Sequence, residues 1–503
     1  MPAVQLPAGS RWPAGPAGPP GRTLLVSNRL PVTARYEQGE ICIQPSDGGL
    51  ASGLRGVHQP ERGLWVGWSG LAEGIPADAH YVFARRLRDK GAIPVQLSAV
   101  EVAGYYRGYC NGALWPALHG CIRKPVTVER DWELYRAVNE RYADIIARHL
   151  RGGDRVWIHD YHLLLLPALL RARCPGARIG FFLHTPFPDP ACFAELPHAP
   201  ALLEGVLGSD LIGFHTRDYR RHFASAIRLL LNRAVPPPAR GVPCRGAKLV
   251  TCPIGIDVSF FAGWARKPAV LAKAAEIRTH GAGPLLVGVD RLDYTKGIPE
   301  RLLAFERLLE LEPSLRRRAR LIQIAVPSRD DVIGYREIRR TVESLVARIN
   351  LRFAEADWSP IDYRYCRVDT ETLVALYRAA DVMLVTPLCD GMNLVAKEFV
   401  TCREDEDGVL VLSSCAGAAA ELHAAVLTDP RDGNDLVRAY RTAVTMMPGE
   451  RQARMRRLRL AVESHDSSRW SRTFLDALGH PQRRGGGHAW IQEDEPAAQL
   501  RLV

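Results

Sequence analysis

The sequence predicts an α/β protein with two domains, each built on a mostly parallel β-sheet. Two observations carry this prediction. Short apolar runs typical of buried strands alternate with amphipathic helical stretches, and the alternation restarts after the segment Phe260–Lys273. At 503 residues the chain is also too long for one ordinary core. Because polar residues follow many of the strands, we expect two Rossmann-like domains that face a deep cleft.

The charge and the apolar content of the sequence limit the kinds of molecule that this protein is expected to bind. The formal net charge of +11 comes from 66 Lys and Arg against 55 Asp and Glu. The densest basic runs, Arg316–Arg318 and Arg456–Arg457, stand among Leu and Ala at helical spacing, which indicates solvated helix faces and not a nucleic-acid-binding stripe. Since neither an apolar run of ~18 residues nor a signal peptide stands out, we expect a cytoplasmic protein with no membrane partner. Anionic small substrates fit the charge.

The cysteines argue against a metal or redox motif. Eleven are scattered along the chain without a C-x-x-C pair. An odd count in a chain without a recognised signal is typical of free thiols, so we expect free cysteines, with neither a structural zinc site nor a thioredoxin-like redox pair.

Domain limits follow from composition. Residues 1–21 hold six prolines and four glycines with almost no charge, which predicts a disordered tail. We expect an N-terminal domain over 22–265, a C-terminal domain over 266–455, a helical return over 456–480, and a flexible tail over 481–503.

The first half places polar groups after its strands. A strand over Thr23–Ser27 leads to Arg29, a candidate anion contact, and Gly48 and Gly49 form either a turn or a backbone that approaches a diphosphate closely. In the strand over Gly63–Gly70, core packing explains one of Trp65 and Trp68, and the other could form a sugar-stacking wall.

Further candidates follow in the same half. Tyr106 and Trp115 belong to a polar and aromatic cluster that fits a carbohydrate site or a packed loop. An amphipathic helix over Val128–Leu150 precedes strands that end near Asp160 and His184. A single His at a strand end is more often structural than catalytic.

The second half repeats the pattern. A strand over Pro284–Val289 meets a polar loop that holds Arg291 and Lys296, five positions apart, before a helix that starts near Pro299. These cations could converge on a phosphate, or they could be ordinary surface charges. A strand over Leu321–Val326 delivers Arg329 in the same way.

The stretch Asp390–Glu398 follows a buried strand over Asp381–Thr386 and opens a helix. Its two end carboxylates are eight positions apart, and the free N–H groups of Gly391 to Leu394 favour an anion. Two carboxylates that hold hydroxyls beside amides that hold phosphate suggest a nucleotide-sugar site. The alternative is that Asp390 is only an N-cap and Glu398 only a solvated helix residue.

Taken together, these segments resemble the trehalose-6-phosphate synthase family, retaining family 20 glycosyltransferases of the GT-B type. The matching motifs, in the family's order, are S-N-R-L-P at 27–31, G-G-L at 48–50, W-V-G-W-S-G at 65–70, N-G-A-L-W-P at 111–116, W-I-H-D-Y-H-L-L at 157–164, G-F-F-L-H-T-P-F-P at 180–188, R-L-D-Y-T-K-G at 291–297, P-S-R at 327–329 and D-G-M-N-L-V-A-K-E at 390–398. The resemblance spans about residues 22–480.

The resemblance implies a role for each matching residue. Those implied in catalysis are His184, Arg291, Lys296 and Asp390. Those implied to contact a nucleoside-diphosphate glucose are Gly48, Gly49, Arg291, Lys296, Val368, Leu394, Val395 and Glu398. Those implied to bind glucose 6-phosphate are Arg29, Trp68, Tyr106, Trp115, Asp160 and Arg329. No metal or other cofactor is implied, and a homo-oligomer, a dimer or a tetramer, is expected.

Two departures and two alternatives stay open at this point. Cys389 and Asp290 replace residues that are commoner in the family, and the segment near Val368 does not separate UDP-, GDP- and ADP-glucose. A glucosylglycerol-phosphate synthase would use glycerol 3-phosphate as acceptor. A sugar-phosphate-sensing relative without activity should have lost some of the residues implied in catalysis, and all are present.

Overall fold

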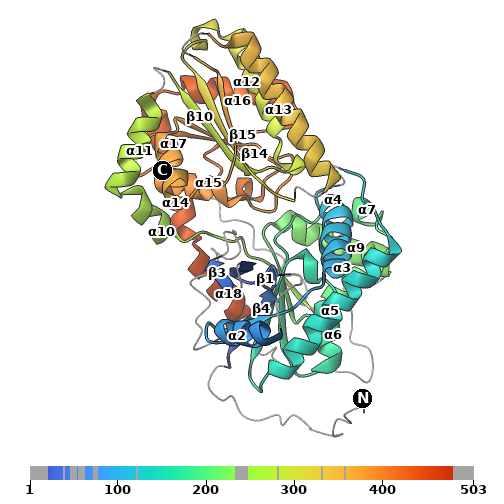
Figure 1. Ribbon diagram of the computed structural model, residues 1–503. Helices are drawn as coiled ribbons and strands as arrows, with labels where there is room; N and C mark the ends of the chain where they lie inside the picture. Colours follow the sequence, from blue (N-terminus) through green and yellow to red (C-terminus); the bar gives the residue numbers. More distant parts are fainter. Residues whose placement is uncertain are drawn as a thin grey trace, which may run out of the picture.

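The computed structural model describes residues 21–37, 40–45, 54, 63–71, 77–120, 123–232, 247–279, 283–329, 332–355 and 358–479. Two bodies face each other, each with helices on both faces of a sheet (Figure 1). The two tails predicted to be disordered lie outside the described residues, apart from residue 21.

The N-terminal sheet has, within the described residues, seven parallel strands in the order β5-β4-β1-β6-β7-β8-β9. Its strands are β1 (Thr23–Arg29), β4 (Gly63–Trp68), β5 (Ala92–Pro94), β6 (Arg155–His159), β7 (Arg178–Phe182), β8 (Leu211–Phe214) and β9 (Lys248–Thr251). Alternate residues face opposite sides, so Leu24 and Val26 pack in one core while Leu25 packs in the other. Burial on both faces explains the nearly continuous apolar runs.

The helices of this body surround the sheet. They are α2 (Ala77–Arg88), α3 (Ala99–Glu101), the π-helix η1 (Val102–Leu114), α4 (Trp115–Leu118), α5 (Glu129–His149), η2 (Tyr161–Leu163), α6 (Leu166–Arg173), α7 (Pro190–Phe193), α8 (Ala199–Val206) and α9 (Arg217–Leu231). An antiparallel hairpin of β2 (Val32–Glu37) and β3 (Glu40–Pro45), which the sequence did not reveal, follows β1.

The C-terminal sheet has six parallel strands among the described residues, in the order β12-β11-β10-β13-β14-β15. They are β10 (Leu285–Arg291), β11 (Arg320–Val326), β12 (Ile361–Tyr365), β13 (Val382–Val385), β14 (Val409–Ser413) and β15 (Val426–Thr428). The helices around it are η3 (Tyr294–Lys296), α12 (Ile298–Leu311), η4 (Pro313–Leu315), α13 (Ile333–Phe353), α14 (Thr370–Ala379), α15 (Leu394–Cys402), η5 (Gly417–Ala420) and α16 (Gly433–Thr445). The predicted pair of parallel α/β domains is therefore confirmed.

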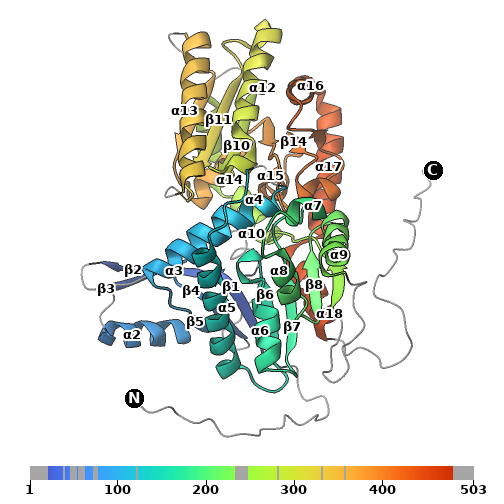
Figure 2. The same cartoon turned by 90° about the vertical axis from the view of Figure 1, so that its right-hand side faces the viewer.

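Four helices join the bodies. After β9 the chain enters α10 (Val258–Ala265) and α11 (Pro268–Thr279), which pack against α14 and α15. The predicted return is two helices: α17 (Pro448–Ser464) stays with α15 and β14, and α18 (Ser467–Gly479) lies beside β7 and β8 of the other body (Figure 2).

The cysteine prediction is wrong at one position, because Cys192 is disulfide-bonded. The spacing of cysteines along the sequence could not show which of them meet in space. The described helices include none that is both long and apolar enough to cross a membrane.

The packing of α18 should be needed for stability. Phe474 is 1% exposed and stacks on Trp157 of β6, with ring centroids 4.7 Å apart. Phe474→Ala should lower the free energy of unfolding by about 3 to 5 kcal/mol in urea titrations, because a large buried ring leaves a cavity. The control Leu460→Ala, at a position that is 66% exposed, should cost under about 0.5 kcal/mol. Equal losses in the two variants would contradict this packing role.

Candidate active site

Most of the predicted site residues lie at the carboxyl ends of the strands, where the two bodies meet. Arg29 is the last residue of β1, Arg291 is the last of β10, His184 lies two residues after β7, and Arg329 lies three residues after β11. Parallel strands end at one edge of their sheet, so motifs far apart in sequence become neighbours.

Lys296 and Asp390 form the central ion pair of the C-terminal body. The Lys296 Nζ donates to Asp390 Oδ2 at 2.5 Å, and their side chains are only 8% and 16% exposed. Burial acts to raise the pKa of Asp390, but the charge and hydrogen bond of Lys296 outweigh it and lower that pKa. Asn393 Nδ2 also donates to Oδ2, at 3.0 Å. Asp390 is therefore an ionised acceptor, and it lies outside helix α15, which begins at Leu394.

Two glycines let the bodies meet closely. A Cβ at Gly391 would lie 1.9 Å from the backbone oxygen of His184 in the N-terminal body, and one at Gly417 would lie 2.0 Å from the Gly391 oxygen. Such contacts exclude any side chain. Tyr219 of α9 adds a hydrogen bond across the interface, because its hydroxyl donates to the Asp390 carbonyl at 2.9 Å.

Arg329 is held by groups from both bodies. Its guanidinium donates to the Tyr335 hydroxyl of α13 and, at 3.1 Å, to the Tyr161 hydroxyl of η2. It also lies 4.2 Å from the Trp115 ring centroid, and its backbone φ is 53°. A left-handed backbone at a non-glycine residue is strained, which marks a position that the surrounding structure over-determines.

Asp293 supplies the negative charge beside Arg329. This carboxylate is 1% exposed, accepts from Tyr335 at 2.8 Å and lies 3.7 Å from Arg329. Burial acts to raise the pKa of Asp293, but the nearby cations, Arg329 foremost, outweigh it and lower that pKa. The sequence reading gave no role to Asp293, although it stands inside the R-L-D-Y motif.

Aromatic rings line the side of Arg29. Its guanidinium lies 4.4 Å from the Trp68 ring centroid, and Trp68 meets Tyr106 edge-on at 6.0 Å. Tyr106 stacks on His162 at 5.9 Å and 14°. Trp68 is 4% exposed and its indole donates to the Leu71 carbonyl, so it is mainly a packed support for Arg29.

Asp160 follows β6 with a φ of 76°, another left-handed position. Its Oδ1 accepts from the His184 backbone N–H at 3.3 Å. Burial raises the pKa of Asp160 to about 6. The carboxyl is thus mostly ionised at neutral pH and becomes protonated in mild acid.

Glu398 lies on α15, one turn beyond Leu394 and Val395, which open that helix. Burial raises the pKa of Glu398 to about 7, while a hydrogen bond of 2.8 Å from the Tyr377 hydroxyl acts to lower it. A carboxylate poised near neutrality can accept from ligand hydroxyls.

Three further residues that the sequence predicts in the site, Val368, Gly48 and Gly49, add little to its geometry. Val368 lies in the link between β12 and α14 and packs partly against the core. Gly48 and Gly49 lie outside the described residues.

Two residues differ from those that are commoner in the resembled family. Asp290 forms a buried ion pair of 2.5 Å with Arg301, and Cys389 directly precedes Asp390.

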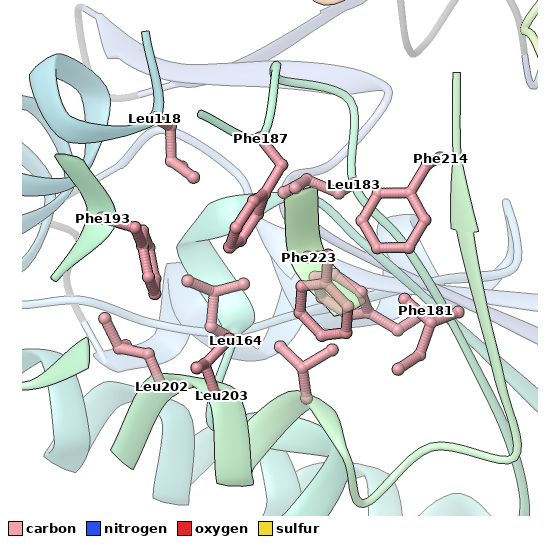
Figure 3. A pocket seen from close by; sticks show the side chains of 12 residues that line it. Leu118, Leu164, Phe181, Leu183, Phe187, Phe193, Leu202, Leu203, Phe214 and Phe223 are labelled. Carbon is pink, nitrogen blue, oxygen red and sulfur yellow. The ribbon is translucent and has the colours of Figure 1, made fainter. Parts of the chain in front are cut away.

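The site is distinct from a small apolar cavity in the N-terminal core. That cavity of about 10 Å³ is lined by Leu, Phe, Val and Ile side chains, among them Phe187 and Phe223 (Figure 3). Its apolar lining offers no side-chain hydrogen-bond partner to a polar ligand or an ordered water.

Comparison with known proteins decides the family. The model of glycosyltransferase family 20 matches residues 21–480. The chain belongs to glycosyltransferase family 20.

Relatives share nearly their whole length with this chain. An alpha,alpha-trehalose-phosphate synthase [UDP-forming] of Aspergillus fumigatus is 40% identical over 93% of this chain and 92% of its own. The trehalose-6-phosphate synthase of Mycobacterium avium is 40% identical over 92% of this chain and 96% of its own.

Solved structures agree in fold. The UDP-forming alpha,alpha-trehalose-phosphate synthase of Burkholderia xenovorans, in complex with glucose-6-phosphate, has a TM-score of 0.81 at 35% identity, covering 92% of this chain and 100% of that one. An E. coli structure described as trehalose-6-phosphate bound with UDP-2-fluoro glucose has a TM-score of 0.81 at 34% identity, covering 92% and 99%. The two-domain GT-B arrangement expected from the sequence is therefore confirmed.

The hydrogen bond between Tyr377 and Glu398 gives a prediction. In Tyr377→Phe the pKa of Glu398 should rise by about one pH unit above the value near 7, because the carboxylate loses its charge-assisted donor while burial persists. Carboxyl ¹³C NMR titration, assigned by the signal that disappears in Glu398→Gln, would measure it. Tyr81→Phe, at a tyrosine that is 73% exposed, serves as control. A lower or unchanged pKa would contradict the predicted effect.

Proposed function

We propose that this protein is a retaining glucosyltransferase that moves glucose from UDP-glucose to glucose 6-phosphate and releases UDP and trehalose 6-phosphate. The observation that carries the proposal is that the cations and carboxylates at the domain interface come from both bodies and suit two anionic substrates. Family membership and relatives described as UDP-forming trehalose-phosphate synthases support it.

On the donor side, Arg291 and Lys296 would bind the diphosphate, with the backbone of Leu394 and Val395 at the start of α15. Asp390 and His184 would hold hydroxyls of the transferred glucose, and Glu398 would hold the ribose hydroxyls. The proposal also includes Gly48, Gly49 and Val368, which the family resemblance implies would contact the UDP-glucose.

On the acceptor side, Arg29 and Arg329 would share the phosphate, one from each body. Tyr106 and Asp160 would contact the sugar, with Trp68 and Trp115 as the aromatic surroundings. The ring of Trp115 already packs against Arg329 at 4.2 Å and lies 5.6 Å from Arg291, so it lies between the two proposed phosphate sites.

The proposed reaction needs charge stabilisation more than acid or base groups. The bond between the anomeric carbon and the diphosphate oxygen breaks, and the growing negative charge meets Arg291 and Lys296. The acceptor hydroxyl attacks from the same face, and its proton passes to the departing diphosphate oxygen. Retention then requires no covalent enzyme intermediate.

We propose that no metal is required, because Arg291 and Lys296 would supply the positive charge that neutralises the diphosphate. We also propose a homo-oligomer in the cytoplasm, as expected from the sequence.

A substrate panel tests the function. Purified protein should release UDP from UDP-glucose with glucose 6-phosphate as acceptor, with or without EDTA. Activity with glycerol 3-phosphate instead would identify a glucosylglycerol-phosphate synthase and overturn the proposed acceptor. Binding of both substrates without turnover would identify a sensing relative, and loss of activity in EDTA would overturn the metal-independent step.

Arg291→Ala should lower kcat by about 10²- to 10³-fold and change the acceptor KM little, because its charge is needed most as the diphosphate leaves. Steady-state kinetics with both substrates varied would separate the two effects. Arg364→Ala, on an arginine paired with Asp362 on β12, is the control. If the acceptor KM changes as much as kcat, the leaving-group role is wrong.

Arg329→Lys should raise the acceptor KM about tenfold with a smaller effect on kcat. Lysine keeps the charge beside Asp293 but loses the planar fork that two tyrosines and a phosphate need. Arg329→Ala should raise the acceptor KM further. The matched control is Arg339→Lys on α13, where the ion pair with Glu343 is exposed. Unchanged acceptor kinetics in both Arg329 variants would exclude the phosphate role.

A further inference from the structure

Three histidines lie side by side at the ends of three neighbouring strands. His159 is the last residue of β6, His184 lies two residues after β7, and His215 directly follows β8. The ring centroid of His184 is 5.3 Å from that of His159 and 5.3 Å from that of His215. Only His184 has a role in the proposed function, so the purpose of its neighbours is open to inference.

Burial keeps all three rings neutral. It lowers the pKa of His184 to about 3 and holds the pKa values of His159 and His215 well below the usual value. A neutral imidazole has one N–H donor and one acceptor nitrogen. The hydrogen bonds of each ring therefore decide which of its nitrogens carries the proton.

One hydrogen bond couples the tautomers of two rings. His159 Nδ1 and His184 Nε2 are 3.1 Å apart. Either His159 donates and His184 keeps its own proton on Nδ1, or His184 donates from Nε2 and its Nδ1 becomes an acceptor. The two cases give opposite hydrogen-bonding properties to the other side of the His184 ring.

The surroundings of His159 favour the first case. Its Nε2 is buried without a hydrogen-bond partner among the described residues. The nearby indoles of Trp157 and Trp470, with centroids at 4.6 and 6.3 Å, carry N–H donors only. The indoles offer no acceptor to an N–H on Nε2, and a buried N–H without an acceptor costs more than a buried acceptor without a donor, so the His159 proton belongs on Nδ1.

His215 has a separate task. Its Nδ1 accepts from the Ile254 N–H at 3.4 Å, which leaves its proton on Nε2. The His215 ring hydrogen-bonds to the backbone carbonyl of His184. It thus holds the backbone of His184, whereas His159 holds the ring.

We propose that His159 is a positioning residue that fixes the orientation and tautomer of His184, so that His184 offers Nδ1–H as a donor to a hydroxyl of the transferred glucose. The part about glucose rests on the proposed function. The tautomer itself is a property of the free protein and can be measured without substrate.

Two substitutions separate this role from packing. In His159→Asn an amide nitrogen takes the place of Nδ1 and can still donate to His184. In His159→Gln the amide lies near the place of Nε2, and nothing donates at the Nδ1 position. Trp470→Phe is the packing control, because Trp470 contacts both rings and its indole N–H has no hydrogen-bond partner in the described part of the chain.

The first measurement is the tautomer of His184, read from two-bond ¹⁵N–¹H correlations of the ligand-free protein at pH 8. We expect the proton on Nδ1 in the unmodified protein, in His159→Asn and in Trp470→Phe, and a mixture in His159→Gln. A proton on His184 Nε2 in the unmodified protein would overturn the proposal, whatever the variants do.

The second measurement is kinetic. His159→Gln should raise the KM for UDP-glucose about five- to tenfold, the loss of one hydrogen bond, with the acceptor KM unchanged. His159→Asn should stay within about twofold. Equal effects of both variants would reduce His159 to a structural residue. If the protein transfers no glucose at all, the proposed function fails, but the tautomer measurement still decides the role of His159.

Discussion

The repulsion among cations is the constraint on which this site depends. Arg29, Arg291, Lys296 and Arg329 converge at one domain interface before any phosphate is bound. Two unit charges about 4 Å apart repel by about 4 kcal/mol at the effective dielectric of a protein surface, so such a group needs compensation. Asp390 pairs with Lys296, and Asp293 lies beside Arg329. Both carboxylates have lowered pKa values despite burial, which shows that the cations dominate their surroundings. Two carboxylates against four cations still leave a net positive charge, which anionic substrates can neutralise.

Compensation of the positive charge by carboxylates would not by itself bring the two bodies into contact. The backbone of Gly391 touches the His184 carbonyl, and Gly417 packs against Gly391 in turn. A Cβ at Gly391 would lie 1.9 Å from the His184 oxygen, so a side chain there would force the central ion pair away from the N-terminal strand ends, and one at Gly417 would displace Gly391. Tyr219 and Tyr161 then add hydrogen bonds across the same interface. Charge compensation therefore explains why carboxylates accompany the cations. The two glycines explain how closely the two bodies can approach each other.

The sequence predicted structure well where a physical requirement restricts the types of residue that can meet it. Buried parallel strands need apolar runs, and Arg29, Arg291 and Arg329 follow such runs, so both the sheets and these strand-end cations could be predicted. The π-helix over Val102–Leu114 and the β2–β3 hairpin were missed because their residues carry no regular period. Partners were missed for a different reason. Tyr161 meets Arg329 across 168 positions, and nothing in either local pattern encodes that contact. The disulfide at Cys192 was missed for the same reason.

The position of Arg329 connects the fold with the proposed chemistry. It belongs to the C-terminal body, yet a tyrosine and a tryptophan of the N-terminal body hold its guanidinium, opposite Tyr335 and Asp293 of its own body. Its left-handed backbone, with a φ of 53°, is of the strained kind that surrounding contacts must stabilise. An acceptor phosphate shared between Arg29 and Arg329 would therefore join the two bodies through the same groups that already hold them. The proposed acceptor site would be complete only when the bodies are together. The proposed attack on the donor would then be confined to the arrangement in which both substrates are enclosed.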